Sequence, residues 1–121
     1  MPGVLVVDDE QDMRMLVEAV IQRANEGLEV VGSAASGAEA IEQWREIGPD
    51  MIVLDQMMPG MSGLEAAATI LAEQPDQDII LFSAFLDANT RARASELGIR
   101  ACLPKTDLPR LPETLWRFGT D

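Results

Sequence analysis

The sequence predicts an α/β fold with one parallel sheet and right-handed crossover connections. Two observations predict this fold. Short runs of four or five residues, most of them rich in Val, Ile and Leu, alternate along the chain with stretches of helical periodicity. Such runs are typical of strands that are buried on both faces of a parallel sheet. The length of 121 residues, with 47% hydrophobic and 25% charged residues, suits one domain of this kind.

Five strands are expected along the chain. They are VLVV (4–7), LEVV (28–31), MIVL (51–54), DIILF (78–82) and RACL (100–103). Four helices are expected between them, over 11–24, 37–47, 63–74 and 88–97. Ser62 and Asp87 are the expected N-caps of the third and fourth helices, and Gly98 is the expected stop of the fourth.

The last element is less regular, because DLPRLPETLWRFG contains two prolines. Proline is tolerated in the first turn of a helix and breaks its interior. We therefore expect an irregular turn over 107–110, followed by a short helix that begins near Pro112 and ends at about Phe118.

Composition excludes several classes of function. The formal net charge of −12 disfavours direct nucleic-acid binding and binding to anionic lipid. No apolar run approaches the roughly 20 residues of a membrane span, and the N-terminus lacks the basic segment of a signal peptide. A single cysteine, Cys102, permits no internal disulfide, so a cytoplasmic location is expected. The absence of histidine excludes a histidine base or metal ligand.

Polar side chains follow four of the expected strands at the point where each strand ends. Asp8 and Asp9 follow the first strand, Asp55 follows the third, Ser83 follows the fourth, and Lys105 closely follows the fifth. Lys105 is the only lysine of the chain, whose other eight cationic residues are arginines. Because parallel strands bring their carboxyl ends to one edge of the sheet, these side chains are expected to lie close together.

This combination of groups indicates phosphoryl chemistry. Crowded carboxylates require a cation, and Mg²⁺ prefers oxygen ligands and bridges to phosphate. A lysine adds a compact positive charge, a serine hydroxyl can donate to a phosphoryl oxygen, and a carboxylate can attack phosphorus. Taken singly, each residue has a simpler interpretation, because acidic residues after a strand also cap helices, serine forms turns and a lone lysine is commonly solvated.

The chain resembles the receiver domain of two-component response regulators, a flavodoxin-like domain of the chemotaxis-regulator type. The resemblance runs from VLVVDDE through MIVLDQMMPGMSGLE and ILFSA to LPK, and so covers essentially all of residues 1–121. It implies a single receiver domain built as a three-layer, doubly wound sandwich. The sheet is expected to have five parallel strands in the order 2-1-3-4-5, with five helices, the last of them short.

The resemblance also implies a role for each polar residue. Asp55 corresponds to the phosphoacceptor, Ser83 to the hydroxyl that binds the phosphoryl group, and Lys105 to the cation that neutralises it. The implied ligands of Mg²⁺ or Mn²⁺ are the side chains of Asp8, Asp9 and Asp55 and the backbone carbonyl of Met57.

The implied partners belong to bacterial phosphorelay signalling. Since the chain has no histidine, a sensor histidine kinase or a histidine phosphotransfer protein is expected to donate the phosphoryl group. A downstream protein, or an output domain outside this chain, is expected to read the switch. The chain is expected to catalyse only its own phosphotransfer and dephosphorylation, and not to act as an enzyme on other substrates.

Three features depart from the family pattern. Cys102 occupies the position where the family usually has an aromatic switch residue, for which Phe85 is a candidate substitute. Pro104 precedes Lys105, whereas proline normally follows this lysine, and the Leu103–Pro104 bond is left open as cis or trans. The final segment has two prolines where the family has a regular helix.

Three alternatives compete with a phosphorylatable switch. A receiver fold used for phosphorylation-independent protein contacts is the main one, because of Cys102. A haloacid-dehalogenase-type phosphatase would require a second Asp at position 57, which is Met. A flavodoxin-like FMN protein would require a Ser/Thr-rich loop after the first strand, where Asp8, Asp9 and Glu10 would repel phosphate.

Overall fold

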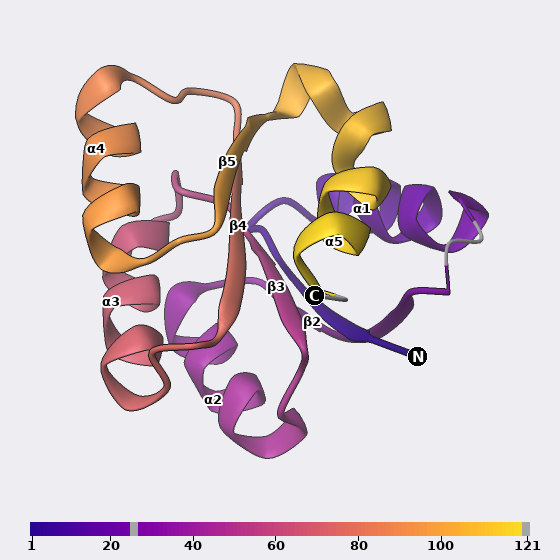
Figure 1. Ribbon diagram of the computed structural model, residues 1–121, viewed down its shortest axis with the longest axis horizontal. Coiled ribbons are helices and arrows are strands. Elements are labelled where there is room, and N and C mark those ends of the chain that lie inside the picture. The colour runs from indigo at the N-terminus through magenta and orange to yellow at the C-terminus, as the bar shows by residue number, and fades with distance from the viewer. Residues whose placement is uncertain (25–26, 120–121) are drawn as a thin grey trace.

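The computed structural model describes residues 1–24 and 27–119 (Figure 1). Its parallel sheet has five strands: β1 (Gly3–Val7), β2 (Glu29–Ala34), β3 (Met51–Leu54), β4 (Asp78–Ser83) and β5 (Ala101–Pro104). Their order is β2-β1-β3-β4-β5, which confirms the expected order.

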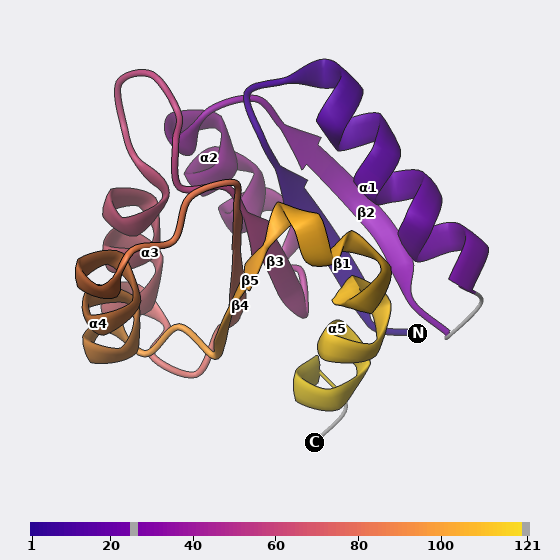
Figure 2. The same cartoon turned by 90° about the horizontal axis from the view of Figure 1, so that it is seen from above.

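Five α-helices connect and cover the strands of the described residues: α1 (Gln11–Ala24), α2 (Gly37–Ile47), α3 (Gly63–Glu73), α4 (Ala88–Leu97) and α5 (Leu111–Gly119). A 3₁₀ helix, η1 (Lys105–Arg110), precedes α5. Helices α2, α3 and α4 lie on one side of the sheet, whereas α1 and α5 lie on the other (Figures 1 and 2). The fold is therefore the expected three-layer, doubly wound sandwich.

Both faces of the sheet are buried, because successive strand residues point to opposite sides. In β1, Leu5 and Val7 pack in the cluster that contacts α2 and α3, while Val4 and Val6 pack in the cluster that contacts α1 and α5. All four side chains are at most 1% exposed. This double burial explains why the central strands are continuously apolar in sequence.

The helix ends confirm the expected caps. Ser62 and Glu65 form a capping box at the start of α3, in which each residue's backbone N–H donates to the other's side chain at 3.2 Å. The Asp87 carboxylate accepts from the Thr90 backbone N–H at 2.7 Å and caps α4. Gly98 ends α4 with a φ of 98°, which favours glycine.

Several boundaries differ from the expectation. Strand β2 covers 29–34, not 28–31, because its backbone pairs with β1 as far as the Val7–Ala34 pair. Strand β5 begins and ends one residue later than expected, and helix α3 ends one residue earlier than expected. The expected turn over 107–110 is part of the 3₁₀ helix η1, and α5 begins at Leu111, one residue before Pro112.

The Leu103–Pro104 bond, which the sequence left open as cis or trans, is trans, since no cis peptide bond occurs among the described residues.

A buried polar contact connects α2 to the chain before β4. The Trp44 indole Nε1–H donates to Gln77 Oε1 at 3.0 Å, and Gln77 Nε2 donates to the backbone carbonyls of Pro49, Asp50 and Asp78 at 3.1–3.3 Å. Gln77 is 3% exposed, so water cannot readily replace these bonds. Gln77 therefore satisfies several buried polar groups at once.

Replacing Gln77 with Leu is expected to lower the free energy of unfolding by about 2 kcal/mol, because the Trp44 N–H and the backbone carbonyls lose their partner. Urea unfolding followed by tryptophan fluorescence measures the change. The exposed Gln74 supplies the matched control, since Gln74→Leu should alter stability by no more than about 0.5 kcal/mol. Equal stability of the two variants would contradict the role assigned to Gln77.

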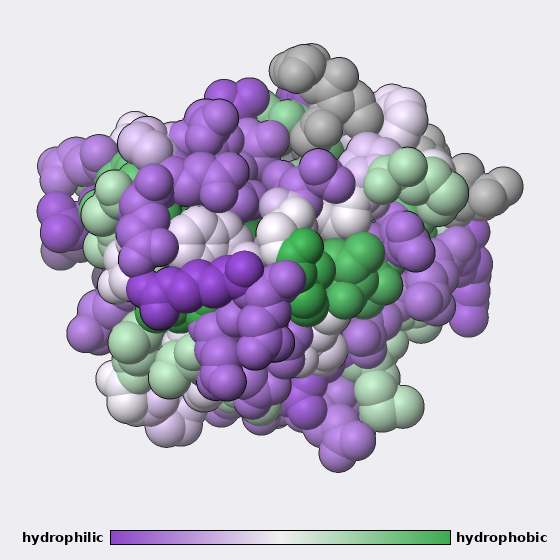
Figure 3. Space-filling view, turned by 90° about the horizontal axis from the view of Figure 1, so that it is seen from below, coloured by the Kyte–Doolittle hydropathy of each residue, from purple (hydrophilic) through white to green (hydrophobic). Residues whose placement is uncertain are grey.

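The surface is mixed in character. Seen from below, the molecule is mainly hydrophilic, with one compact hydrophobic patch near the centre of the view (Figure 3). Exposed large hydrophobic side chains among the described residues include Met1, Met15, Leu16, Ile47, Met57, Phe85 and Trp116. Within residues 1–24 and 27–119, no helix combines the length and the apolar character needed to cross a membrane.

Candidate functional site

The sequence-predicted site residues lie where four neighbouring strands end. Asp8 directly follows β1, Asp55 directly follows β3, Ser83 is the last residue of β4, and Lys105 directly follows β5. Val7 pairs with Leu54, Leu54 with Leu81 and Ser83 with Pro104, so the strands end within about two residues of one another. The carboxyl edge of the sheet therefore brings together residues that lie far apart in sequence.

Three carboxylates form one cluster at this edge. Asp8, Asp9 and Asp55 each offer an oxygen atom that lies within 4.8 Å of the oxygens offered by the other two. Asp8 and Asp55 are 3% exposed, whereas Asp9 is exposed. The cluster contains only hard oxygen donors and opens to solvent on the side of Asp9, which suits a hydrated divalent ion.

Lys105 connects two of these carboxylates. Its Nζ lies 2.7 Å from Asp8 Oδ2 and 3.3 Å from Asp55 Oδ2, and its side chain is 13% exposed. A single compact ammonium can approach both oxygens, whereas a planar guanidinium would require more room. The only lysine of the chain is therefore largely withdrawn from solvent beside the carboxylate cluster and is not a solvated surface cation.

Two buried oxygen atoms at the site have no hydrogen-bond partner among the described residues. They are Asp55 Oδ1 and Ser83 Oγ. Buried polar atoms without partners are uncommon in folded proteins and carry a cost in free energy. A metal ion beside Asp55 and a phosphoryl oxygen beside Ser83 would supply the missing interactions, so the residues present fit both groups.

The electrostatics of the site show a shortage of positive charge. Burial raises the pKa of Asp55, and the neighbouring Asp8 raises it further, while Lys105 and the Met57 backbone act in the opposite direction without cancelling the rise. Burial acts to lower the pKa of Lys105, but its hydrogen bond to Asp8 and its attraction to Asp55 outweigh burial, so the pKa is raised. Lys105 is thus held protonated, and a further cation would favour ionised Asp55.

This imbalance predicts that Asp55→Asn stabilises the unmodified protein in metal-free buffer. A folded-state pKa above the unfolded value means that stability falls as pH rises through the interval between them, so ionised Asp55 costs stability at pH 7. We expect a gain of about 1 kcal/mol, or roughly 4 °C in Tm, that disappears below the unfolded pKa of about 3.9.

Thermal unfolding in EDTA, measured against pH, checks this gain. The exposed Asp76 is a suitable control, because Asp76→Asn should leave Tm within about 1 °C of the wild-type value. A lower Tm for Asp55→Asn at neutral pH would show that its carboxylate is stabilised in the fold, contrary to the electrostatics.

The geometry of the site depends on residues that the sequence did not indicate. Arg14 Nη1 donates to the backbone carbonyl of Asp8 at 2.7 Å, and the Glu10 N–H donates to Asp8 Oδ1 at 2.9 Å. These contacts fix the loop between β1 and α1. In sequence, Arg14 has the pattern of an ordinary helix-surface arginine, so only the fold reveals the contact.

The loop after Asp55 depends on Gln56 and Gly63. Gln56 Oε1 accepts from the Leu64 N–H at 2.7 Å, and the Gln56 carbonyl accepts from the Gly63 N–H at 3.0 Å. A side chain at Gly63 would collide with the backbone carbonyl of Asp55. Glycine is therefore required where α3 begins, so that the helix can start against the end of β3.

Two exposed apolar side chains lie beside the site in the sequence. Met57 and Phe85 are each 64% exposed. The proposed metal contact of the Met57 backbone carbonyl and the proposed switch role of Phe85 both stay predictions. Cys102, at the position of the family's usual aromatic switch, is half-buried on β5.

Comparisons of sequence and of fold relate the chain to known proteins. A sequence model described as "Response regulator receiver domain" matches residues 4–115. The chain is 42% identical over 113 residues to chemotaxis protein CheY of Thermotoga maritima, covering 93% of this chain and 92% of that protein. It is 37% identical to a protein-glutamate methylesterase/protein-glutamine glutaminase of Geobacter metallireducens, of which it spans only 33%.

A solved structure shows the same fold. The response regulator protein TrrA of Thermotoga maritima, in complex with Mg²⁺–BeF, superimposes with a TM-score of 0.85 at 33% identity. The match covers 98% of this chain and 99% of that one.

Proposed function

The chain belongs to the response regulator receiver domain family, and from this premise we propose that it is a phosphorylatable switch whose phosphoacceptor is Asp55. The observation that carries the proposal is the arrangement around Asp55. Lys105 Nζ contacts one of its carboxylate oxygens at 3.3 Å, while its other oxygen and the Ser83 hydroxyl at the end of β4 are buried with no hydrogen-bond partner within residues 1–24 and 27–119. We assign the receiver domain to residues 1–121.

The phosphoryl group comes from a phosphohistidine on a sensor histidine kinase or a histidine phosphotransfer protein, because this chain has no histidine. An Asp55 oxygen attacks phosphorus in line. The new O–P bond forms as the N–P bond to the donor imidazole breaks, and the imidazole nitrogen retains the electron pair. Lys105 offsets negative charge on the transferred group throughout the step.

Asp8, Asp9, Asp55 and the Met57 carbonyl would hold Mg²⁺ or Mn²⁺ at this edge of the sheet. When bound, the ion neutralises charge on the carboxylates and the phosphoryl oxygens. The all-oxygen cluster supports this assignment, as does the relative TrrA, whose structure contains Mg²⁺–BeF. Arg14 holds the Asp8 backbone in place through its 2.7 Å hydrogen bond.

Ser83 connects the site to the rest of the fold. Its hydroxyl donates to a phosphoryl oxygen once Asp55 is modified, which draws the loop between β4 and α4 toward the site. Helix α4 buries only Ala94 within the described structure, so its packing resists displacement weakly. A local hydrogen bond can then bias a two-state element that a partner reads.

The binding of beryllofluoride with Mg²⁺, which imitates a phosphoryl group on a carboxylate, tests the proposal without a phosphodonor. Thermal unfolding of the wild type is expected to show a clear rise in Tm when both are present, and little rise with either alone. The same treatment should leave the Tm of Asp55→Asn unchanged. A wild-type chain that shows no combined effect would contradict the proposal.

Replacing Ser83 with Ala is expected to change the stability of the unmodified protein little and to reduce the Tm rise of the modified protein strongly. In the unmodified state the Ser83 hydroxyl has no partner among the described residues, so its loss should change stability by less than about 1 kcal/mol. With beryllofluoride and Mg²⁺, the variant should lose roughly half of the wild-type Tm rise, because a hydrogen bond to a charged group is missing. Ser83→Thr keeps the hydroxyl and should restore the rise; an undiminished rise in Ser83→Ala would exclude this role.

The remaining assignments follow from the same premise. The chain works in the cytoplasm, catalyses only its own modification, and signals to a downstream protein or to an output domain. Its charge of −12 argues against direct contact with nucleic acid. Cys102, in place of an aromatic switch, favours one alternative: a receiver fold that binds partners without phosphorylation. An absence of response to beryllofluoride would select that alternative.

A further inference from the structure

Asp9 differs from the other two carboxylates of the cluster in how its side chain is held. Asp8 accepts from the Glu10 N–H through Oδ1, and its Oδ2 lies 2.7 Å from Lys105 Nζ. Asp55 contacts the same ammonium at 3.3 Å. The Asp9 side chain is exposed, and no hydrogen bond or ion pair holds it in the described part of the chain. Its place in the cluster therefore depends on the backbone that carries it.

The backbone before Asp9 is held on one side by the sheet and on the other by Arg14. The Asp8 N–H donates to the Ala34 carbonyl at 3.1 Å, which continues the pairing of β1 with β2. The Asp8 carbonyl accepts from Arg14 Nη1 at 2.7 Å. Because this carbonyl shares one plane with the Asp9 N–H, its hydrogen bond sets the orientation of the whole peptide unit. That orientation decides the direction in which the Asp9 side chain leaves the backbone.

Arg14 makes this contact because of its place on α1. It is the fourth residue of the helix, and long side chains on a helix point back toward the helix N-terminus. The guanidinium therefore passes the first turn and meets the loop between β1 and α1. Arg14 is half-buried, and its planar guanidinium is preorganised for donation, so little conformational freedom is lost for the bond it forms.

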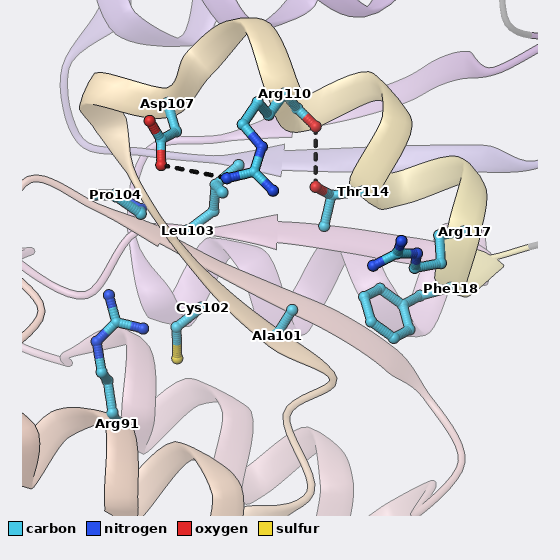
Figure 4. Close-up of a pocket in the computed structure, with 10 residues that line it drawn as sticks. All are labelled: Arg91, Ala101, Cys102, Leu103, Pro104, Asp107, Arg110, Thr114, Arg117 and Phe118. Atoms are coloured by element: carbon cyan, nitrogen blue, oxygen red, sulfur yellow. Dashed lines mark hydrogen bonds and ion pairs between the residues drawn. The ribbon is translucent and has the colours of Figure 1, made fainter.

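The ion-paired arginines of the described structure make a different kind of contact. Four of them pair with carboxylates: Arg45 with Glu73, Arg93 with Glu96, Arg100 with Asp78 and Arg110 with Asp107. Figure 4 shows the last of these pairs, at 3.8 Å, beside a hollow of about 380 Å³ that α4, β5, η1 and α5 line. Arg14 has no carboxylate partner among the residues that the structure describes. It therefore acts on the position of a backbone segment and does not neutralise a side chain.

We propose that Arg14 is a positioning residue for the divalent ion. By holding the peptide unit before Asp9, it directs the Asp9 carboxylate toward the oxygens of Asp8 and Asp55. This role rests on the metal-dependent function proposed above and deepens it, because it assigns part of the metal affinity to a residue outside the ligand set. Residues that orient metal ligands commonly contribute about 10- to 100-fold to metal affinity.

The positive charge of Arg14 has the opposite effect on the ion. A guanidinium near a cation site repels the cation, so removal of the charge alone should strengthen the binding of a divalent ion. Loss of the hydrogen bond lets the peptide unit turn and displaces Asp9 from the cluster, which should weaken the binding. The sign of the change in metal affinity therefore separates positioning from a simple electrostatic effect.

The affinity for Mn²⁺, measured from the electron paramagnetic resonance signal of the free ion, tests the proposal without a phosphodonor. Arg14→Met is expected to weaken binding by about tenfold. Arg23→Met is the matched control, because Arg23 is exposed in the last turn of the same helix, and binding should stay within about twofold of wild type. Unchanged or tighter binding in Arg14→Met would overturn the proposal.

Two further variants show that the measured binding belongs to the cluster and depends on a hydrogen-bond donor. Binding that Asp9→Asn removes is assigned to the cluster, and binding that persists unchanged in this variant would overturn the proposal. Arg14→Lys keeps both the charge and a donor, so it should weaken Mn²⁺ binding by less than about threefold. A loss in Arg14→Lys as large as that in Arg14→Met would show that the donor does not matter.

Self-phosphorylation from acetyl phosphate distinguishes positioning of the ion from a general defect. Arg14→Met should require about tenfold more Mg²⁺ for half of its maximal rate. The maximal rate should stay within about threefold of wild type, because Asp55 and Lys105 are unchanged. A lower maximal rate with an unchanged Mg²⁺ requirement would place Arg14 in the transfer step and overturn the proposal.

Thermal unfolding in EDTA checks that Arg14→Met is folded. Arg14→Gln, which is neutral and too short to keep the same bond, provides a second variant for which weaker Mn²⁺ binding is expected. A wild-type chain that binds no Mn²⁺ would contradict the metal site itself, and with it the role of Arg14. A wild-type chain that binds Mn²⁺ no more tightly than Arg14→Met would overturn only the role of Arg14 and leave Asp55 as the proposed acceptor.

Discussion

An Asp55→Asn chain is expected to accept no phosphoryl group. The amide cannot attack phosphorus. Asp9 is exposed and Asp8 is the closer partner of Lys105, at 2.7 Å, so neither is expected to replace Asp55, whose second oxygen is buried with no hydrogen-bond partner in the described part of the chain. Loss of the nucleophile should reduce phosphoryl incorporation by at least about a thousandfold.

Transfer from a radiolabelled phosphohistidine donor, with excess Mg²⁺, measures this loss. The exposed Asp76 again supplies the control, and Asp76→Asn should incorporate as much label as the wild type. Thermal unfolding must show that the Asn variant is folded, which is expected because it should be more stable than the wild type in metal-free buffer. Substantial label on Asp55→Asn would place the acceptor elsewhere.

Lys105→Met is expected to have the largest effect on stability. It removes the ammonium that contacts Asp8 at 2.7 Å and Asp55 at 3.3 Å, and leaves two carboxylates that are 3% exposed without their cation. Breaking a buried charge pair from one side should cost about 3 kcal/mol in EDTA. Mg²⁺ should recover much of this loss, because the ion supplies positive charge to the same oxygens.

Denaturant unfolding with EDTA and with Mg²⁺ separates these effects. Lys105→Arg serves as the charge-conserving control, and its stability should lie between those of Lys105→Met and the wild type, since a guanidinium is planar and larger. Phosphoryl transfer to Lys105→Met should fall by about a hundredfold even with Mg²⁺. If Lys105→Met is as stable as the wild type in EDTA, the ammonium of Lys105 does not compensate the charge of the carboxylates.

The sequence located most of the candidate site because the fold has a simple rule. A parallel sheet has one carboxyl edge, so residues that directly follow apolar runs must meet there. Asp8, Asp55, Ser83 and Lys105 all have this position, and the structure brings them together. Their chemical roles depend on the family and on the tests above, and not on position alone.

The features that the sequence did not predict arise from the way in which loops and helices pack against the strand ends. Arg14 reaches the Asp8 carbonyl only because α1 begins beside the site, and Gly63 is required only because α3 starts against Asp55. Strand β2 continues to Ala34 because backbone pairing with β1 does not depend on side-chain polarity.

Intact-mass spectrometry followed by peptide mapping tests the central claim most directly. Wild-type protein incubated with acetyl phosphate and Mg²⁺ should gain the mass of one phosphoryl group, carried by the peptide that contains Asp55, and should gain none when EDTA replaces Mg²⁺. A modified peptide that lacks Asp55, or an unchanged mass with Mg²⁺ present, would contradict the assignment of this carboxylate cluster as a metal-dependent phosphoacceptor.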